Sequence, residues 1–287
     1  MRLFRFGEYN NEKPALELND GRKIDVSHYV NDYNEKFFVD GGLDYLHYIA
    51  NNLADKCTLV PSDIRFGSPI ARPSKIICIG LNYVNHAKET NSPLPKEPII
   101  FLKATSALMG PNDQVIIPRD SQSTDWEVEL AVVIGKKASY IEKENALEYI
   151  AGYTIHNDYS ERDFQLRRGG QWVKGKSCDT FAPLGPYLVT ADEIPHPHNL
   201  NLWLKVNGRE FQKSNTQDMI FNIPFLIHYI SQFMTLLPGD VISTGTPSGV
   251  GLGFNPPIYL HDGDIVELGI DHLGQQKQVA ANYHLPN

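Results

Sequence analysis

The stretch Trp126-Glu127-Val128-Glu129-Leu130-Ala131-Val132-Val133-Ile134-Gly135 decides how this chain is expected to fold. Side chains of a β-strand point to alternate faces, so Glu127 and Glu129 share one face of a predicted strand. The opposite face is apolar, and the glutamate face continues with Ala131 and Val133, so we expect both faces to be at least partly enclosed. Two carboxylates about 5–6 Å apart repel by about 3 kcal/mol at an effective dielectric near 20, which favours a cation between them.

A third carboxylate follows in His156-Asn157-Asp158-Tyr159, at the end of another expected strand. An acidic pair on a strand is more often a solvated face, but the apolar continuation of both faces argues for enclosure here. Carboxylate oxygens are hard donors, and they suit Mg²⁺, Mn²⁺ or Ca²⁺ better than a metal that prefers thiolates. Glu127, Glu129 and Asp158 are therefore the candidate ligands of one divalent cation.

The composition excludes several classes of protein. The chain has 287 residues, 41% of them hydrophobic, and a formal net charge of −8 without a basic block, which argues against nucleic acid as a partner. No apolar run reaches membrane-spanning length and the N-terminus has no signal-peptide pattern, so we expect a cytoplasmic protein without a membrane partner. Cys57, Cys78 and Cys178 are widely spaced, which predicts neither disulfides nor a zinc site. The pair His196 and His198 is expected on the surface.

Two parts of the chain differ in their pattern. Residues 1–72 predict a small N-terminal α+β domain, with strands over 2–6, 14–18 and 23–26, a short helix near 43–50, and a linker over 68–73. Residues 73–287 predict a larger, strand-rich domain. Its expected strands cover residues 75–80, 98–103, 114–117, 128–135, 152–158, 203–206, 209–212, 241–244 and 265–270, with helical segments at 145–150 and 224–233. Many short strands with few helices favour a mixed β fold with minor α over a doubly wound sheet.

The segment from Asp158 to Gln165 combines an acid, a guanidinium and an amide. If a helix starts at Asp158, then Asp158, Arg162 and Gln165 fall on one helix face at i, i+4 and i+7. Arginine matches the geometry of a carboxylate through two-point contact, so this face could hold an acidic ligand. An aspartate that caps the helix, with an ordinary Asp–Arg pair behind it, is the alternative.

Two further segments could move protons or stabilise charge. His86 and Glu89 lie three apart on a probable short helix after Gly80, so the glutamate could orient the imidazole to take a proton from water. In the segment Gln171–Thr180, Lys174 or Lys176 could stabilise a developing oxyanion. A lone His–Glu pair, or lysines in a glycine-rich loop, are more often surface features.

The loop Ser243-Thr244-Gly245-Thr246-Pro247-Ser248-Gly249-Val250-Gly251 is rich in glycine and hydroxyl groups. Glycines allow close approach of the backbone to a ligand, and exposed amides and hydroxyls bind anions. The loop is not a P-loop, because no Gly-Lys-Ser/Thr follows.

Taken together, these five segments resemble the fumarylacetoacetate hydrolase family over roughly residues 73–280, in unbroken order. The resemblance implies a divalent metal, usually Mg²⁺, on Glu127, Glu129 and Asp158. It implies substrate contacts at Arg162, Gln165 and Thr246, and we add Tyr83. It assigns catalytic roles to Lys176 and to a His86–Glu89 pair on a mobile lid, and leaves Lys174 on the surface. The implied fold is a β-sandwich or β-roll with a small N-terminal domain, and the implied assembly is a homodimer.

The family resemblance also implies a reaction. The stretch from Lys75 to Leu252 is most similar to a bacterial subgroup that acts on 2,4-diketo-3-deoxy sugar acids such as the L-rhamnonate or L-fuconate derivatives. We therefore expect a hydrolase that cleaves a carbon–carbon bond of a 2,4-diketo acid into pyruvate and a carboxylic acid. Oxaloacetate decarboxylation, isomerisation of a diacid and ureidoglycolate lyase activity on the same metal site remain alternatives. A non-catalytic protein that binds a metal or a small acid is a further one.

Overall fold

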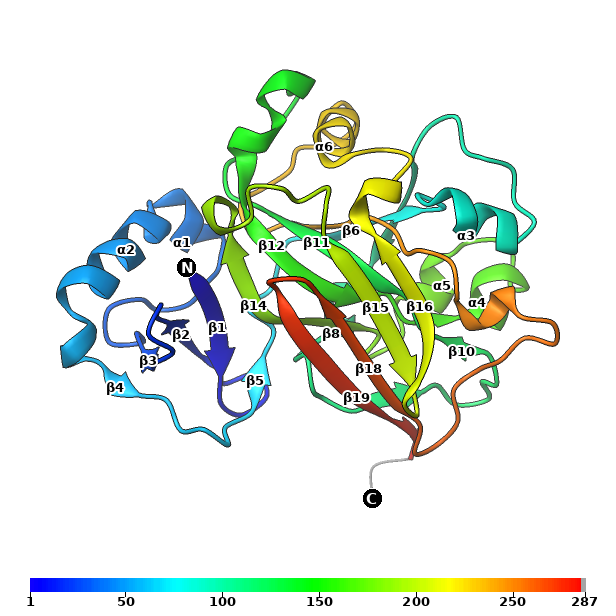
Figure 1. Ribbon diagram of the computed structural model, residues 1–287, viewed down its shortest axis with the longest axis horizontal. Coiled ribbons are helices and arrows are strands. Elements are labelled where there is room, and N and C mark those ends of the chain that lie inside the picture. The colour runs from blue at the N-terminus through cyan, green and yellow to red at the C-terminus, as the bar shows by residue number, and fades with distance from the viewer. Residues whose placement is uncertain (285–287) are drawn as a thin grey trace.

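The computed structural model describes residues 1–284, and its largest element is a sheet of twelve strands (Figure 1). Ten of them form one continuous order, which runs β4 (Thr58–Leu59), β3 (Lys23–Asp25), β2 (Lys13–Glu17), β1 (Arg2–Phe6), β14 (Ala182–Thr190), β12 (Ile150–Asn157), β11 (Val128–Ile134), β17 (Val241–Ser243), β6 (Ile76–Gly80) and β7 (Ile99–Lys103). The short strands β5 (Phe66–Gly67) and β8 (Leu108–Met109) pair with β1 and β14. The acidic strand β11 therefore lies well inside the sheet, between β12 and β17.

A second sheet and a short ribbon complete the strands. The second sheet has the order β16 (Arg209–Asn215), β15 (Asn201–Val206), β18 (Ile265–Ile270), β19 (Gly274–Asn282) and β9 (Val115–Ile117). The ribbon pairs β10 (Thr124–Asp125) with β13 (Ser160–Glu161). Together with the large sheet they confirm the prediction of a mostly β fold.

The helices are few and short. The α-helices are α1 (Glu35–Val39), α2 (Gly42–Asn52), α3 (Val84–Glu89), α4 (Arg162–Leu166), α5 (Val173–Lys176) and α6 (Ile223–Ser231). Short 3₁₀ helices connect other elements, the longest being η3 (Lys143–Tyr149). Within residues 1–284, no helix is long and apolar enough to cross a membrane.

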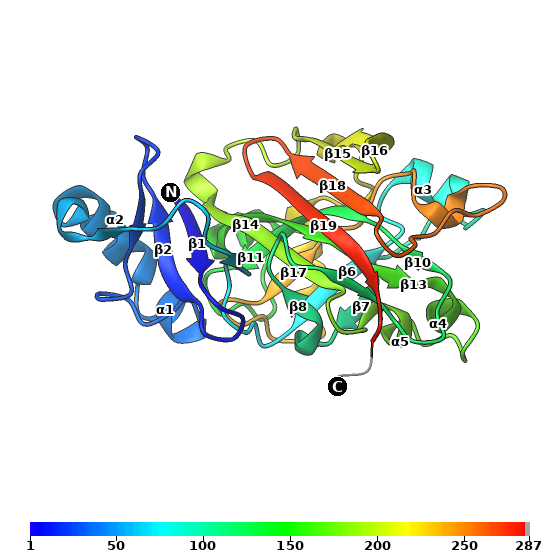
Figure 2. The ribbon, with the colours of Figure 1, turned by 90° about the horizontal axis from the view of Figure 1, so that it is seen from below.

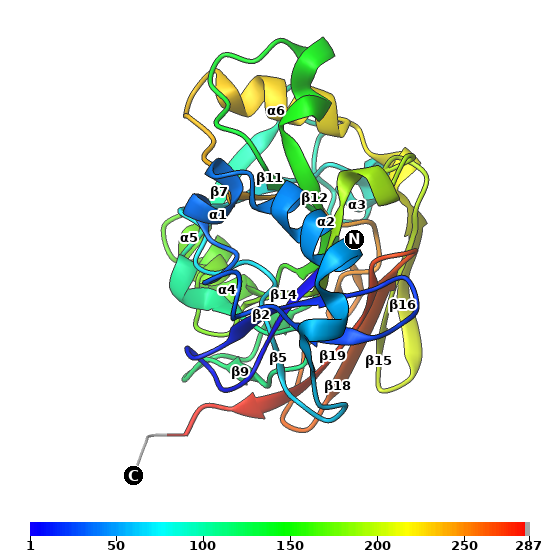
Figure 3. The same cartoon turned by 90° about the vertical axis from the view of Figure 1, so that its left-hand side faces the viewer.

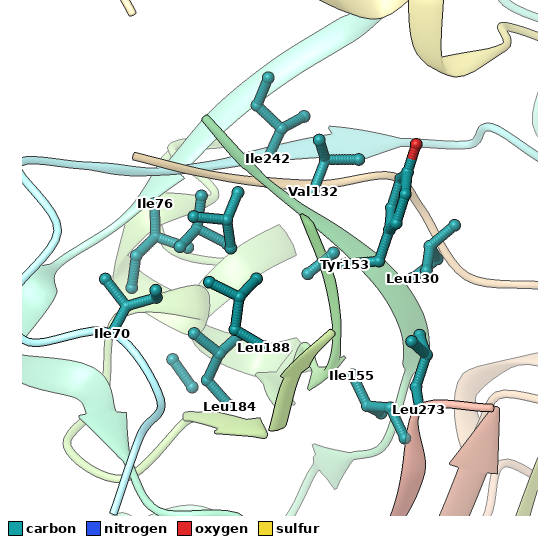
Figure 4. Close-up of a cluster of buried hydrophobic side chains, with 14 of the residues drawn as sticks. Ile70, Ile76, Leu130, Val132, Tyr153, Ile155, Leu184, Leu188, Ile242 and Leu273 are labelled. Carbon is teal, nitrogen blue, oxygen red and sulfur yellow. The ribbon is translucent and has the colours of Figure 1, made fainter. Parts of the chain in front are cut away.

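The two sheets pack face to face over one apolar core. In Figure 2 the strands β15, β18 and β19 form a layer that crosses β14, β17 and β6 of the large sheet. Gln276 of β19 joins the layers directly, because its buried amide donates to the backbone carbonyls of Ile155 on β12 and Gly185 on β14. Figure 4 shows part of the core, where Leu130, Ile155 and Leu273 lie together. Apolar burial of this kind is the main contribution to stability.

Residues 1–72 continue the large sheet. β1 pairs antiparallel with β14, and Leu3, Leu16 and Ile24 belong to the same core cluster as Ile76 of β6. In Figure 3, α1 and α2 lie in front of this end of the sheet, near the N-terminus. A separate N-terminal domain with a boundary at residues 72 and 73 stays a prediction.

Three local expectations can be compared with the structure. The Asn207-Gly208 hairpin between β15 and β16 is confirmed, with φ of 50° and 78° at these two residues. β14 was not predicted, because Pro183 and Pro186 lie inside it and prolines argue against a strand. The helix expected to start at Asp158 begins four residues later, at Arg162, because β13 comes first and pairs with β10.

The core position of Ile155 predicts a large loss of stability on truncation. Ile155 is fully buried between the sheets, so Ile155→Ala should lower the free energy of unfolding by about 2–5 kcal/mol, as measured by urea denaturation. Leu59 of β4 is 61% exposed, and Leu59→Ala is the matched control, with an expected change of at most about 0.5 kcal/mol. Equal losses in both variants would contradict the packing described here.

Candidate active site

The three predicted metal ligands come together at the ends of two neighbouring strands. Glu127 directly precedes β11 and Glu129 lies within it, while Asp158 directly follows β12, which pairs with β11. Each of the three carboxylates offers one oxygen, and these oxygens lie within 4.8 Å of one another. All three residues are buried. The antiparallel register places them together, because Val128 pairs with Asn157 and the amide of Asp158 donates to the carbonyl of Glu127.

Three buried cations surround two of these carboxylates. The Nζ of Lys176 lies 2.8 Å from Glu127 Oε2 and 2.8 Å from Asp158 Oδ2. Lys103 donates to the other oxygen of Asp158, and Arg162 Nη2 lies 2.7 Å from Glu127 Oε1. Burial alone would raise the pKa of Asp158, but Lys103 and Lys176 outweigh it and hold that pKa well below its usual range. Burial opposes the charge of Lys176 too, yet Asp158 and Glu127 raise its pKa.

Glu129 lacks such a partner among the described residues. It accepts hydrogen bonds from the hydroxyl of Ser243 and from the amide of Gly245, at 2.9 Å for the latter, and from no lysine or arginine. Burial, followed by the charges of Asp158 and Glu127, raises the pKa of Glu129 well above its usual range. A divalent cation between the three carboxylates would remove this repulsion and satisfy their preference for a hard ion. The residues present therefore fit a divalent metal.

Arg162 and Gln165 lie beside the carboxylates at the start of α4. The Nε of Arg162 donates to Asp125 Oδ2 at 2.8 Å, and its Nη1 donates to Gln165 Oε1 at 3.0 Å. Its Nη2 is close to Glu127 but makes no hydrogen bond of normal geometry within the described chain. Burial disfavours the charge of Arg162, but Asp125 and Glu127 outweigh it and raise its pKa. The guanidinium is thus fixed by two bonds and keeps a donor for a ligand.

The predicted His86–Glu89 pair is present and nearly buried. On α3, His86 Nδ1 lies 2.8 Å from Glu89 Oε1, which leaves the Nε2 of the imidazole available. The second oxygen of Glu89, Oε2, accepts the amide of Gly249 at 2.8 Å. One carboxylate therefore joins the imidazole to the glycine-rich loop after β17.

Thr246 and Tyr83 differ in where the structure places them. Thr246 faces the carboxylates, although its hydroxyl already donates to the carbonyl of Val128 and accepts from Gln212. Tyr83 instead lines a neighbouring cavity that includes Asp218. Its buried hydroxyl has no hydrogen-bond partner among residues 1–284, and burial, with Glu129 and Asp218, raises its pKa. Tyr83 therefore lines a different cavity from Arg162, Gln165 and Thr246, and its contact with a substrate stays a prediction.

A cavity of about 280 Å³ is lined by the remaining candidates except Asp158 and Glu89, which lie behind Lys176 and His86. Its polar lining includes His86, Glu127, Glu129, Arg162, Gln165, Lys176 and Thr246. Its other wall is apolar and contains Ile79, Leu81, Phe101, Leu166, Trp172 and Leu252. The rings of Trp172 and Phe101 lie 5.3 Å apart, and Gly80 makes room for them, since a Cβ there would come within 2.6 Å of the Trp172 ring.

Residues that the sequence did not single out complete the site. Lys103 is the one charged residue in the otherwise apolar strand β7, and this position in the sequence could have predicted that it lies near a buried acid. Asp125 precedes Glu127 by two, so the alternation that groups the glutamates also predicts its side. It binds Arg162 and accepts the amides of Gly251 and Leu252.

Surface predictions are mostly confirmed. Lys174 and His196 are exposed, whereas His198 is half-buried and its Nε2 accepts the amide of Ile223, at the start of α6. The expectation that His198 lies at the surface is therefore wrong. Its imidazole accepts a hydrogen bond from the amide of Ile223, one of the first amides of α6, which have no carbonyl partner within the helix. The three cysteines are free, as expected.

Known proteins resemble this chain over nearly its whole length. The family model described as "Fumarylacetoacetate (FAA) hydrolase C-terminal" matches residues 75–280. A protein of Burkholderia multivorans with a provisional description as a hydrolase is 49% identical over 97% of this chain and 98% of its own.

Two solved structures add chemical information about relatives. Maleylpyruvate hydrolase from Sphingobium sp. SYK-6, in complex with manganese(II) and pyruvate, superposes with a TM-score of 0.83 at 29% identity. A 5-carboxymethyl-2-hydroxymuconate delta-isomerase from Mycobacterium smegmatis superposes with a TM-score of 0.76 at 34% identity. Both alignments cover 99% of this chain and 100% of the other. The relatives thus include a hydrolase and an isomerase, and the hydrolase is the one bound to metal.

The raised pKa of Glu129 predicts the pH dependence of the metal-free protein. An acid whose pKa is raised on folding stabilises the folded state fully below its unfolded pKa, here near 4.5, and this contribution is lost as pH rises through the folded pKa. In EDTA, wild type should therefore lose stability relative to Glu129→Gln as pH rises from 5 to 8, by up to about 1.4 kcal/mol per pH unit.

Urea unfolding of the two proteins at several pH values measures this difference. The glutamine keeps a carbonyl for the donors Ser243 and Gly245 but carries no charge, so it is the matched variant. Saturating Mn²⁺ should reverse the order, because the wild type gains a metal ligand that the variant lacks. Parallel pH curves in EDTA would show that Glu129 is not the strained group.

Proposed function

We propose that this chain, which belongs to the fumarylacetoacetate hydrolase family, is a metal-dependent enzyme that hydrolyses a carbon–carbon bond of a 2,4-diketo acid. The observation that carries the proposal is the shared cavity: the carboxylates Glu127 and Glu129 face the same space as His86 and Lys176. A metal, a base for water and a cation for an oxyanion are the three groups that this hydrolysis needs.

The metal would be held by Glu127, Glu129 and Asp158. Mg²⁺ is the ion we propose, and Mn²⁺ or Ca²⁺ suit the same oxygen ligands. Bound there, a divalent cation supplies a Lewis acid that stabilises negative charge on a 2-oxo acid.

The substrate's carboxylate would be fixed by Arg162. Its Nη2 has a hydrogen to donate, and its other nitrogens are held by Asp125 and Gln165. A guanidinium that is already oriented loses little freedom when it binds a carboxylate. Gln165 and Thr246 line the cavity beside it and limit where the acid can lie.

His86 would activate the water. Because Glu89 holds Nδ1, the free Nε2 can take a proton from water, and the hydroxide attacks the C4 carbonyl. The ammonium of Lys176, inside the same cavity, stabilises the oxyanion that forms on the C4 oxygen. The C3–C4 bond then breaks, its electron pair forms the enolate of pyruvate, and C3 takes up a proton. The products are pyruvate and a carboxylic acid, so one water is consumed for each bond cleaved.

The residues that line the cavity indicate which kind of substrate tail, beyond the reacting carbonyl groups, the site can hold. A 2,4-diketo-3-deoxy sugar acid carries hydroxyl groups on its tail, for which Thr90 and Ser92 line the cavity. The apolar side of the cavity, with Phe101 and Trp172, suits an unsaturated carbon segment such as the double bond in the tail of maleylpyruvate, which ends in a carboxylate. Both tails belong to 2,4-diketo acids, and the reacting atoms are the same.

Isomerisation is the second candidate, because one relative with 34% identity is a delta-isomerase. An isomerase needs a group that moves a proton between carbons, and His86 could do so without water. Decarboxylation of oxaloacetate and ureidoglycolate cleavage would use the same metal but leave the His86–Glu89 pair without a task. A binding protein would require neither this pair nor Lys176. A homodimer, whatever the reaction, stays a prediction.

A substrate panel separates these reactions. With Mg²⁺ or Mn²⁺, we expect release of pyruvate from 2,4-diketo acids, detected with a coupled dehydrogenase, and its loss in EDTA. The panel contains acids with a hydroxylated tail, acids with an unsaturated tail, and oxaloacetate as the control for CO₂ release. Conversion of an unsaturated diacid without any pyruvate would favour the isomerase, and turnover of oxaloacetate alone would favour the decarboxylase.

The role of His86 predicts a selective loss of activity. His86→Ala should lower kcat for pyruvate release by at least about 10²-fold, the usual contribution of a general base. The shift of the melting temperature with Mn²⁺ should persist, because His86 is not a metal ligand. His196→Ala, at an exposed histidine, is the matched control and should retain activity. Full activity of His86→Ala would remove this residue from the mechanism.

A further inference from the structure

A buried histidine lies behind the metal ligand Glu129 on the neighbouring strand. His156 of β12 pairs directly with Glu129 of β11, and residues opposite each other in a sheet point to the same face. Ser243 of β17 is on the other side of β11, opposite Ala131. His156 and Ser243 thus approach the same face of β11 from its two neighbours, and the small side chain of Ala131 leaves room between them.

The three side chains form a continuous chain of hydrogen bonds. His156 Nδ1 lies 2.7 Å from Ser243 Oγ, and Ser243 Oγ donates to Glu129 Oε2. The ionised form of Glu129, which is the form that binds a metal, can only accept hydrogen bonds. The single hydrogen of the Ser243 hydroxyl then goes to this carboxylate, and the imidazole donates its Nδ1–H to the serine oxygen. This order fixes the tautomer of His156 and the direction of the serine hydroxyl together.

The second ring nitrogen of His156, Nε2, indicates why the hydrogen bond made by the first one matters. The Nε2 of His156 is fully buried and has no hydrogen-bond partner among residues 1–284. A buried unpartnered acceptor destabilises a fold, so packing alone favours an apolar residue at this position. An apolar residue in place of His156 would lack the hydrogen bond between Nδ1 and Ser243.

The hydrogen bonds from His156 to Ser243 and from Ser243 to Glu129 fix the position of the Glu129 carboxylate. Its Oε2 receives the serine hydroxyl and the amide of Gly245. Its Oε1 receives no hydrogen bond from the described residues, so that oxygen is left for another partner. Groups that hold a metal ligand in place from behind commonly change metal affinity by 10–100-fold.

We propose that His156 is a positioning residue for the metal ligand Glu129, acting through the hydroxyl of Ser243. This inference rests on the proposed metal site, but not on the identity of the substrate. His156 touches neither metal nor substrate; it keeps the serine hydroxyl aimed at Glu129, and so keeps the carboxylate ready to bind a divalent cation.

The test is the affinity of the purified protein for Mn²⁺, measured without substrate by the electron paramagnetic resonance signal of free Mn²⁺. His156→Leu and Ser243→Ala should each weaken binding about 10-fold or more. Ser243→Thr keeps the hydroxyl and should bind within about twofold to threefold of wild type. Since the residues act in series, the double variant should be no worse than Ser243→Ala alone.

Thr154 is the matched control. It is buried on the same strand, two residues before His156, and its hydroxyl has no hydrogen-bond partner in the described part of the chain. Thr154→Val should bind Mn²⁺ as wild type does, and melting in EDTA shows whether each variant folds. If His156→Leu fails to fold, His156→Phe replaces it, because its ring fills a similar volume but cannot donate to Ser243.

The outcomes separate the two proposals. Unchanged Mn²⁺ affinity in a folded His156 variant, or equal losses in Ser243→Thr and Ser243→Ala, would overturn the positioning role while leaving the metal enzyme in place. A wild type that binds no Mn²⁺ overturns both the metal site and this inference. Normal Mn²⁺ binding with no turnover of any 2,4-diketo acid would contradict the proposed reaction only.

Discussion

The structure depends on how charge is balanced in a buried acidic cluster. Glu127, Glu129 and Asp158 bring three carboxylates into the interior, where an isolated ion is strongly disfavoured. Lys103, Lys176 and Arg162 offset Asp158 and Glu127, and hydrogen bonds alone support Glu129. The three cations equal the three acids in number, but they contact only Asp158 and Glu127, so Glu129 has no positive charge in contact with it within the described residues, and a divalent ion between the acids would supply one.

The sheet makes this arrangement possible. Neighbouring strands fix side chains to well-defined positions, and β11 has partners on both sides. The acids come from β11 and the end of β12, whereas the cations come from β7, α4 and α5, which lie apart in the sequence. Rigid strands therefore carry the ligands, and shorter elements at the edge bring the groups that neutralise them. Gln276, from the second sheet, ties β12 and β14 from the other side.

Local patterns in the sequence predicted much of the site, and long-range contacts account for what they missed. The alternation around Glu127 and Glu129 predicted their shared face, and the His86–Glu89 spacing predicted their contact. Lys103 and Ser243 contact the site from strands distant in the sequence, which no periodicity reveals. The helix at Arg162 starts late because the pairing of Ser160 with Asp125 keeps the chain extended. Tyr83 was assigned to the substrate from its place beside His86, and this role stays a prediction, because Tyr83 lines a neighbouring cavity while the charge of Glu129 raises the pKa of its hydroxyl.

The two oxygens of Glu89 have a consequence for how such an enzyme can change. One oxygen orients the imidazole of His86, and the other holds the amide of Gly249 in the loop that follows Thr246. A shift of that loop, whether from a larger substrate or from a substitution within it, also pulls on the group that activates water. Substrate selectivity and turnover therefore both depend on the position of the Glu89 carboxylate. A change in this loop that admits a new substrate also has to keep both hydrogen bonds of Glu89 in place.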